Sequence, residues 1–353
     1  MEEAQKHSLE VAVLIPARNE ELNLRTCVES LTAQSEDGFR LGLHWKIWVI
    51  DDHSTDNTLR IARELAAEHE GVVVLQAPEW KRERHGFTGK NAALWHGAQQ
   101  DEVKSAEWIL FTDADTIHKP ESLHRAVVEA ERHQLSMLSY SPQQITTGLL
   151  QRAIMPLVFS ELASVYPPKK INDPSSPVAA ANGQFLLVKR EPYFEIGGHR
   201  AVADQVLEDV ALARKMKRRH AIRLRYAPEA VSARMYRSFG EMWTGWTKNL
   251  ALLFGNPMFL AANRMLDFLL LLGLPAMALL IPFLITWQKA ALWILWLRVI
   301  WRYYNRISRS NFPVGELVLS VIGLPVFAVM LVRSWQRVTL LKTVEWKGRE
   351  YRT

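Results

Sequence analysis

The first half of the chain alternates short apolar runs with segments of helical period, and this alternation limits the possible folds more than any other feature. The apolar runs cover residues 11–16, 45–50, 72–76, 108–112, 137–141 and 184–189. Helices are expected at residues 20–31, 54–70, 90–100 and 208–219. Because parallel strands need long crossover connections, this order predicts an α/β fold with a mainly parallel sheet.

Acidic residues follow two of these apolar runs directly. Asp51 and Asp52 come after the second run, and Asp113 and Asp115 come after the fourth. In open α/β sheets, ligands bind beyond the carboxyl ends of the strands, so these side chains are candidates for a binding site. Two carboxylates two residues apart can face one hard divalent cation, Mn or Mg, that bridges a pyrophosphate. An isolated Asp-x-Asp is also common in solvated turns, so its neighbours decide the interpretation.

Three further motifs surround that acidic pair. They are Ile-Pro-Ala-Arg-Asn-Glu at 15–20, Ile-Asp-Asp-His-Ser-Thr-Asp at 50–56 and Phe-Thr-Gly-Lys-Asn-Ala-Ala-Leu at 87–94. Together they resemble the opening blocks of family 2 glycosyltransferases, which have the GT-A nucleotide-sugar-binding fold. The resemblance implies a nucleotide-sugar donor, with a UDP-sugar favoured. It also implies the donor-binding residues, namely Pro16, Ala17, Arg18, Glu20, Asp51, Asp52, Lys90, Asp113, Ala114 and Asp115, the metal being held by Asp115 and Asp113.

Both Asp51 and Asp52 have an alternative role, because acidic side chains also cap the start of a following helix. That role can hold for one of them while the other binds the donor. Lys90 stands at a helix start, whose free N–H groups favour anions, and the resemblance brings it near the diphosphate.

The acceptor half of the resemblance begins at Gly183 and continues through the turn that contains His199 to the pair Glu208 and Asp209. In the family, a carboxylate of such a pair takes the proton from the acceptor hydroxyl. Asp209 is therefore the expected general base, with Glu208 in reserve. The same two acids would also suit the first turn of the helix that they open.

Residues 237–249 occupy the place where processive family members carry Gln-x-x-Arg-Trp, and this chain lacks that motif. With residues 345–351, this segment resembles the hopanoid- and carotenoid-associated glycosyltransferases of the family. The resemblance implies one transfer to a lipid rather than polymer synthesis. Arg237, Trp246 and Lys248, with Arg349, are expected to close over the diphosphate. A basic, aromatic-rich helix at a membrane surface would look the same without that role.

The C-terminal third has the composition of a membrane region. From residue 241 onward, 13 Lys and Arg stand against 5 Asp and Glu, whereas the preceding residues carry a net charge of −2. Residues 268–287 and 314–332 are expected to span a bilayer, and 290–304 to form a tilted span or an interfacial helix. Residues 239–263 are expected to form a helix on the membrane, with Trp243, Trp246, Leu250, Leu253 and Phe254 on one side. Two spans plus an interfacial helix, or three spans, both remain possible.

These expectations divide the chain into a catalytic domain (1–238), an amphipathic membrane-interface region (239–266), two or three transmembrane helices (267–334) and a basic tail (335–353). The polar N-terminus has no signal peptide, and the single cysteine excludes an internal disulfide. We therefore expect a multi-pass protein of the cell (inner) membrane, with its catalytic domain in the cytoplasm and a lipid acceptor. Nucleic acid is not an expected partner. The alternatives are a polyprenyl-phosphate glycosyltransferase and an inactive nucleotide-sugar-binding membrane protein.

Overall fold

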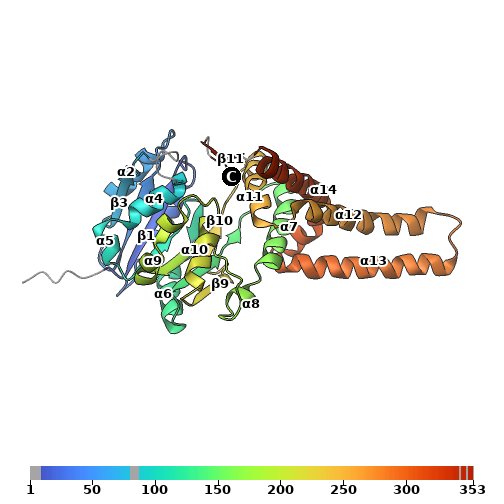
Figure 1. Cartoon of the computed structure of the whole chain (residues 1–353), viewed down its shortest axis with the longest axis horizontal. Helices are drawn as coiled ribbons and strands as arrows, with labels where there is room; N and C mark the ends of the chain where they lie inside the picture. The colour runs from blue at the N-terminus through green and yellow to red at the C-terminus, as the bar shows by residue number, and fades with distance from the viewer. Residues whose placement is uncertain (1–8, 80–86, 342, 347–348, 353) are drawn as a thin grey trace, which may run out of the picture. The chain divides into compact units, whose positions relative to one another are not determined.

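The structure is a computed structural model, and it describes residues 9–79, 87–341, 343–346 and 349–352. The chain forms two compact units. The first contains residues 1–145 and 168–235, and the second contains residues 146–167 and 236–353. Figure 1 labels the helices and strands of both.

A seven-stranded sheet organises the first unit, in the order β3-β2-β1-β4-β8-β6-β9. β8 runs antiparallel to both of its neighbours, and the other adjacent pairs are parallel. The expected mainly parallel α/β sheet is therefore confirmed. Its strands are β1 (Val11–Ala17), β2 (Trp45–Asp51), β3 (Val72–Gln76), β4 (Trp108–Phe111), β6 (Met137–Ser141), β8 (Leu186–Lys189) and β9 (Ile222–Tyr226).

Helices and one small sheet complete this unit. The helices are α1 (Leu24–Thr32), α2 (Thr58–Glu68), α4 (Gly89–Ala98), α5 (Asp101–Ser105), α6 (Ser122–Arg132), α8 (Pro168–Ile171), α9 (Arg190–Glu195), η1 (Gly198–Val202) and α10 (Glu208–Lys217). The small sheet joins β5 (Thr116–His118), β10 (Val231–Ala233) and β7 (Gln143–Gln144). α2 begins four residues later than expected. Asp51 and Asp56 bind the N–H groups of Ser54 and Thr58, and these bonds support a turn before the helix.

The second unit is mainly helical. It contains α7 (Leu149–Val165), α11 (Phe239–Leu253), α12 (Pro257–Leu280), α13 (Thr286–Ile307), η2 (Ser308–Ser310), α14 (Val314–Trp335) and the π-helical turn η3 (Gln336–Leu341). A hairpin of β11 (Thr343–Trp346) and β12 (Arg349–Arg352) follows. α7 lies within the range expected for the catalytic domain, yet it groups with these later helices.

Two of the expected long helices are interrupted. Residues 268–287 do not form one helix, because α12 ends at Leu280 and the chain turns over residues 281–285 before α13. Pro282 explains the break, since proline lacks the N–H group that a helix needs and forces the preceding Ile281 into an extended conformation. Likewise, residues 239–263 are divided between α11 and α12. Asn256 caps the start of α12, because its side chain accepts the N–H group of Phe259.

The apolar side of α11 also differs from its expected role on a membrane. Trp246, Leu250 and Phe254 are buried within the second unit. The indole of Trp246 packs against Phe159 and Tyr236, and its N–H group points at the sulfur of Met155. This face therefore finds partners in the protein, and lipid is not needed to cover it.

Two helical segments in the described part of the chain are long and apolar enough to cross a membrane by length and composition. They are Pro257–Leu280 and Val314–Leu340. α13, with three arginines, does not meet that criterion.

Candidate active site

The first two expected motifs meet at the ends of β1 and β2. Pro16 and Ala17 lie beside Ile50 and Asp51 in the parallel ladder, and the N–H group of Asp52 donates to the carbonyl of Ala17 at 2.8 Å. Arg18 binds the carbonyl oxygen of Asp52 at 2.5 Å and lies 3.7 Å from its carboxylate. Glu20 follows in the same loop, where its N–H group donates to Thr58.

The structure separates the roles open to Asp51 and Asp52. The carboxylate of Asp51 accepts the N–H group of Ser54, with distances of 3.3 and 3.4 Å to its two oxygens. Asp51 thus has the local turn-stabilising role. The nearly buried carboxylate of Asp52 lies next to Arg18.

The acidic pair Asp113 and Asp115, with Ala114 between them, forms the turn between β4 and β5. Thr116 binds the carbonyl of Asp113 at 2.7 Å, and Ala114 is buried beneath the turn. Thr112, just before the motif, donates to the carbonyl of Gln184 at 2.7 Å. The turn is therefore fixed from below, while the side chains of both aspartates remain partly accessible.

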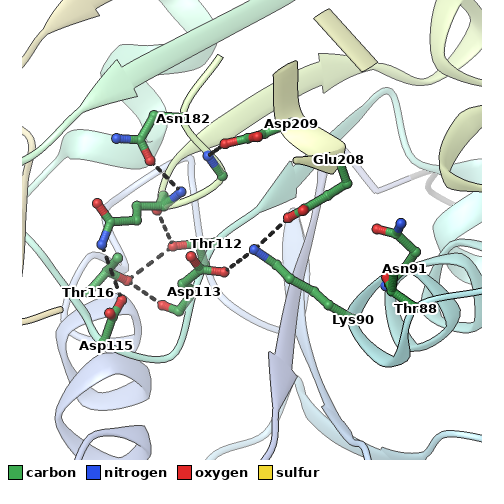
Figure 2. A network of polar contacts seen from close by, with 12 residues as sticks. Thr88, Lys90, Asn91, Thr112, Asp113, Asp115, Thr116, Asn182, Glu208 and Asp209 are labelled. Atoms are coloured by element: carbon green, nitrogen blue, oxygen red, sulfur yellow. Dashed lines mark hydrogen bonds and ion pairs between the residues drawn. The ribbon is translucent and has the colours of Figure 1, made fainter. Parts of the chain in front are cut away.

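Lys90 joins this turn to the acceptor half. Its ammonium lies 2.8 Å from Asp113 Oδ1 and 2.7 Å from Glu208 Oε1 (Figure 2). Burial alone would lower the pKa of Lys90, but these two carboxylates raise it well above its ordinary value. Lys90 is therefore a fixed cation in the first turn of α4.

The first turn of α4 is held in place by the residues on either side of Lys90. Thr88 caps the helix by accepting the N–H group of Asn91. The buried amide of Asn91 donates to the carbonyls of Val202, Ala203 and Gln205. These bonds position the lysine stem, and the role of Asn91 was not foreseen from the sequence, although the residue lies within the motif at 87–94.

Glu208 and Asp209 open α10 and have different environments. Asp209 accepts the N–H groups of Gly183 at 2.9 Å and Val210 at 2.7 Å. Burial and the neighbouring charge of Glu208 raise the pKa of Asp209 to about 7. For Glu208, burial is the largest single influence and acts in the same direction, but the charge and hydrogen bond of Lys90, with smaller contributions from a backbone N–H group and His199, together lower its pKa. Of the two acids, Asp209 thus has the pKa better suited to accept a proton near neutral pH.

Gly183 lies close to all three of these charged groups. A Cβ atom at this position would lie 3.3 Å from the Lys90 ammonium and 3.6 Å from oxygens of both Asp209 and Glu208. One pocket is lined by Pro16, Lys90, Asp113, Gly183 and Asp209, together with other residues of the same unit. The structure therefore brings residues from the donor and acceptor motifs together.

His199 also lines this pocket. It is buried, its Nδ1 lies 2.8 Å from the hydroxyl of Tyr193, and its ring meets Phe111 edge to face. Burial lowers its pKa to about 4, so the imidazole is neutral at physiological pH. In this structure, His199 supports the floor of the pocket.

The other residues expected at the site belong to the second unit. Arg237 precedes α11, and its N–H group donates to Glu241 at 2.8 Å. Trp246 is buried as described above, and Lys248 is half-buried on the same helix. The side chain of Arg349 lies outside the described residues.

Comparison with known proteins identifies the family. The sequence model described as Glycosyl transferase family 2 matches residues 12–196, more than half of the 353 residues. The chain belongs to glycosyl transferase family 2. It is therefore a nucleotide-sugar-dependent glycosyltransferase, as the motifs predicted.

Relatives of this glycosyltransferase include two proteins named 4,4'-diaponeurosporenoate glycosyltransferase. The one from Staphylococcus haemolyticus is 25% identical, and the match covers 97% of this chain and 88% of the relative. The one from Staphylococcus aureus is 23% identical with the same coverage. The resemblance to carotenoid-associated members is thereby confirmed.

Among solved structures, the glycosyltransferase resembles a mannosyltransferase of Pyrobaculum calidifontis in complex with GDP-Man and Mn²⁺. The TM-score is 0.53 at 15% identity, over 94% of this chain and 87% of the other. This similarity supports the GT-A fold.

Gln184 is a residue of the glycosyltransferase site that sequence reasoning missed. Its side-chain amide points at Asp115 Oδ1 at 3.5 Å and accepts a hydrogen bond from Gln144 at 3.1 Å. Its N–H group is held by Asn182. Its position next to Gly183, at the start of the β8 segment that enters the pocket, was the available signal.

Proposed function

We propose that the protein is a metal-dependent inverting glycosyltransferase that moves a sugar from a nucleotide-sugar, with a UDP-sugar favoured, to a membrane lipid. The observation that carries this proposal is the position of Lys90 between Asp113 and Glu208. It joins the expected donor side to the expected acceptor side within one pocket. The lipid acceptor is a hopanoid, a carotenoid or another glycolipid precursor.

In this mechanism, Asp209 takes the proton of the acceptor hydroxyl while the oxygen attacks the anomeric carbon and the bond to the diphosphate breaks. A pKa near 7 leaves a useful fraction of Asp209 ionised and keeps it basic enough to receive that proton. Lys90 stabilises the negative charge that develops on the departing diphosphate. Asp52 and Arg18, with Pro16, Ala17 and Glu20, surround the nucleoside.

Asp113 and Asp115 would hold the divalent metal. The described residues contain no cluster of three or more His, Cys, Asp or Glu side chains that could hold a metal ion by itself. Two carboxylates nevertheless fit Mg²⁺ or Mn²⁺, because such ions commonly keep water ligands and complete their shell with substrate phosphates. When bound, the ion supplies charge neutralisation at the leaving nucleotide.

The membrane placement is supported by the surface of the second unit. The exposed residues of α12 and of α14 up to Val329 are almost all apolar, whereas the charged Arg264, Asp267 and Glu316 are turned inward. A water-soluble protein has the opposite arrangement. We therefore propose a multi-pass protein of the cell (inner) membrane whose catalytic domain faces the cytoplasm, with its membrane helices and basic tail (335–353) in the second unit.

The test is turnover of a panel of nucleotide-sugars by detergent-purified protein with Mn²⁺ or Mg²⁺ and total membrane lipid. Wild type is compared with Asp115→Ala and Asp209→Asn. Metal-dependent glycolipid formation that is lost in both variants is the expected result. Transfer to polyprenyl phosphate alone would favour that acceptor class. Donor binding without transfer or hydrolysis would contradict the enzymatic proposal and favour the inactive binding protein.

The name of the staphylococcal relatives points to a second acceptor chemistry. An -oate acceptor is a carboxylate, which is already ionised at neutral pH, so no base is needed to remove a proton. With such an acceptor, Asp209→Asn should retain most of the transfer activity. Comparing a lipid alcohol with a lipid carboxylate in the same variant distinguishes the two chemistries.

A further inference from the structure

α12 and α13 form a long antiparallel hairpin within the second unit, with the turn at residues 281–285 as its tip (Figure 1). The two helices are joined along their length. Near the middle, the indole N–H group of Trp296 donates to the carbonyl of Leu271 at 2.8 Å. Leu274 and Ala278, nearer the tip, are buried. The hairpin is therefore one packed element.

The outer surface of this hairpin is strongly apolar toward the tip. No residue from 268 to 288 is charged. The large apolar side chains exposed there are Leu269, Leu272, Met277, Leu279, Leu280, Phe283, Ile285, Trp287, Ile294, Leu295 and Leu297. So many exposed apolar side chains on one part of the hairpin call for a non-aqueous environment.

Charged residues gather at the other end of the hairpin, and they are paired. Asp267 of α12 is 2% exposed and binds Arg302 and Arg306 of α13, both at 2.9 Å. Arg264, one turn before Asp267, lies 3.0 Å from Asp267 and 3.3 Å from Glu161 of α7. Two of the three arginines of α13, Arg302 and Arg306, are thus paired with an acid of a neighbouring helix.

We propose that α12 and α13 cross a lipid bilayer together as a hairpin, with the tip at residues 281–285 on the far side and Asp267 paired with Arg302 and Arg306 near the other end. This inference rests on the membrane placement in the proposed function, and it assigns α13 as the return span. Each helix is long enough. With 24 and 22 residues, they extend about 36 and 33 Å, against a hydrocarbon core of about 30 Å.

The tip lies beyond the core because irregular backbone exposed to hydrocarbon is strongly disfavoured. Trp287 and Lys289, just after the turn, have the chemistry of a membrane interface. Arg298 faces outward and can extend its guanidinium toward the near surface. The excess of arginine at residues 298–309 assigns that surface to the cytoplasm.

Cysteine labelling tests this arrangement in membranes that contain the full-length protein. Cys27 is the only native cysteine and is fully buried, so it contributes little background. Phe283→Cys reports the tip, and Ser308→Cys, an exposed position after α13, reports the base. A membrane-impermeant maleimide is added to right-side-out and inverted vesicles.

We expect the two cysteines to react from opposite faces, each with at least a tenfold preference. Reaction of Phe283→Cys from the same face as Ser308→Cys, or from neither face, would overturn the proposal. Asp267→Leu should reduce labelling of the tip from its expected face several-fold, and Asp267→Glu should retain it. Sugar transfer is measured separately in the same vesicles, so a failed topology is distinguishable from a failed assignment of activity.

Discussion

Lys90 Nζ lies 2.7 Å from Glu208 Oε1, and this ion pair connects the first turn of α4 to the first turn of α10. The same ammonium reaches Asp113 at the end of β4. Three separate parts of the first unit thus meet at one cation. The charge of Glu208 is also one cause of the raised pKa of Asp209, so this contact affects the proposed base.

Replacement of Lys90 tests that connection. Lys90→Met leaves two carboxylates without their cation, and a charged hydrogen bond contributes about 1.5–3 kcal/mol. We expect kcat/KM to fall about 100-fold, with weaker binding of the nucleoside diphosphate measured by calorimetry. Lys215→Met, a change on α10 outside the pocket, is the control and should have near wild-type activity. Unchanged donor binding in Lys90→Met would contradict the role assigned to Lys90.

The raised pKa of Asp209 predicts a specific pH dependence of the transfer activity. With a pKa near 7, set by burial and Glu208 and opposed by Lys90, Asp209 loses its proton as the pH rises from 6 to 8. For a hydroxyl acceptor, kcat/KM should rise across this range and reach a plateau above it. Asp209→Asn should be inactive throughout, and Asp204→Asn, an exposed position nearby, should keep the wild-type profile.

The same shift predicts an effect on stability. The pKa of Asp209 is higher in the folded protein than in the unfolded chain, so its contribution to stability is present at low pH and is lost as the pH rises through about 7. Asp209→Asn removes this ionisation. The apparent Tm of the variant should therefore decline less than that of wild type between about pH 4 and pH 7, and an equal decline would contradict the shift.

Gln184 is expected to position Asp115. Gln184→Ala removes the amide that points at the carboxylate, so Asp115 should be less well oriented. We expect the Mn²⁺ concentration for half-maximal activity to rise several-fold, with activity restored at saturating metal. Asp115→Ala should not be restored in this way. A loss in Gln184→Ala that metal cannot relieve would argue for a different role.

Asp51 and Asp52 should respond differently to substitution. Asp51→Ala removes the acceptor for the Ser54 N–H group and should lower the free energy of unfolding by about 1 kcal/mol. Asp52→Ala should weaken binding of the nucleoside diphosphate about tenfold or more. Thermal unfolding and calorimetry of both variants make the comparison, and equal effects on donor binding would contradict the separation.

The sequence predicted the sheet better than the helical region. Six of its seven strands were predictable because buried strands are short, continuous apolar runs. β9 was missed because Arg223 and Arg225 interrupt its apolar residues. The expected run at 72–76 coincides with β3, and that at 45–50 extends by one residue to Asp51. The break of residues 268–287 at Pro282 was missed because a proline is often tolerated within membrane helices.

The candidate site was predictable where its residues lie in local sequence motifs. Asp113, Asp209 and Lys90 stand in recognisable motifs, whereas Gln184 acts through a tertiary contact with Asp115 that no local pattern indicates. The burial of Trp246 also depends on α7, because its partners Met155 and Phe159 lie far away in the sequence.

The membership of α7 in the second unit has a consequence for synthesis on the ribosome. Gly323 of α14 lies so close to Ala153 of α7 that a Cβ atom there would be 2.3 Å from the carbonyl oxygen. α7 is translated before residues 168–235, but this partner follows only after them. The apolar face of α7 therefore lacks this neighbour until residue 323 has been made, and the nascent protein would depend on a chaperone or an insertion factor during that interval.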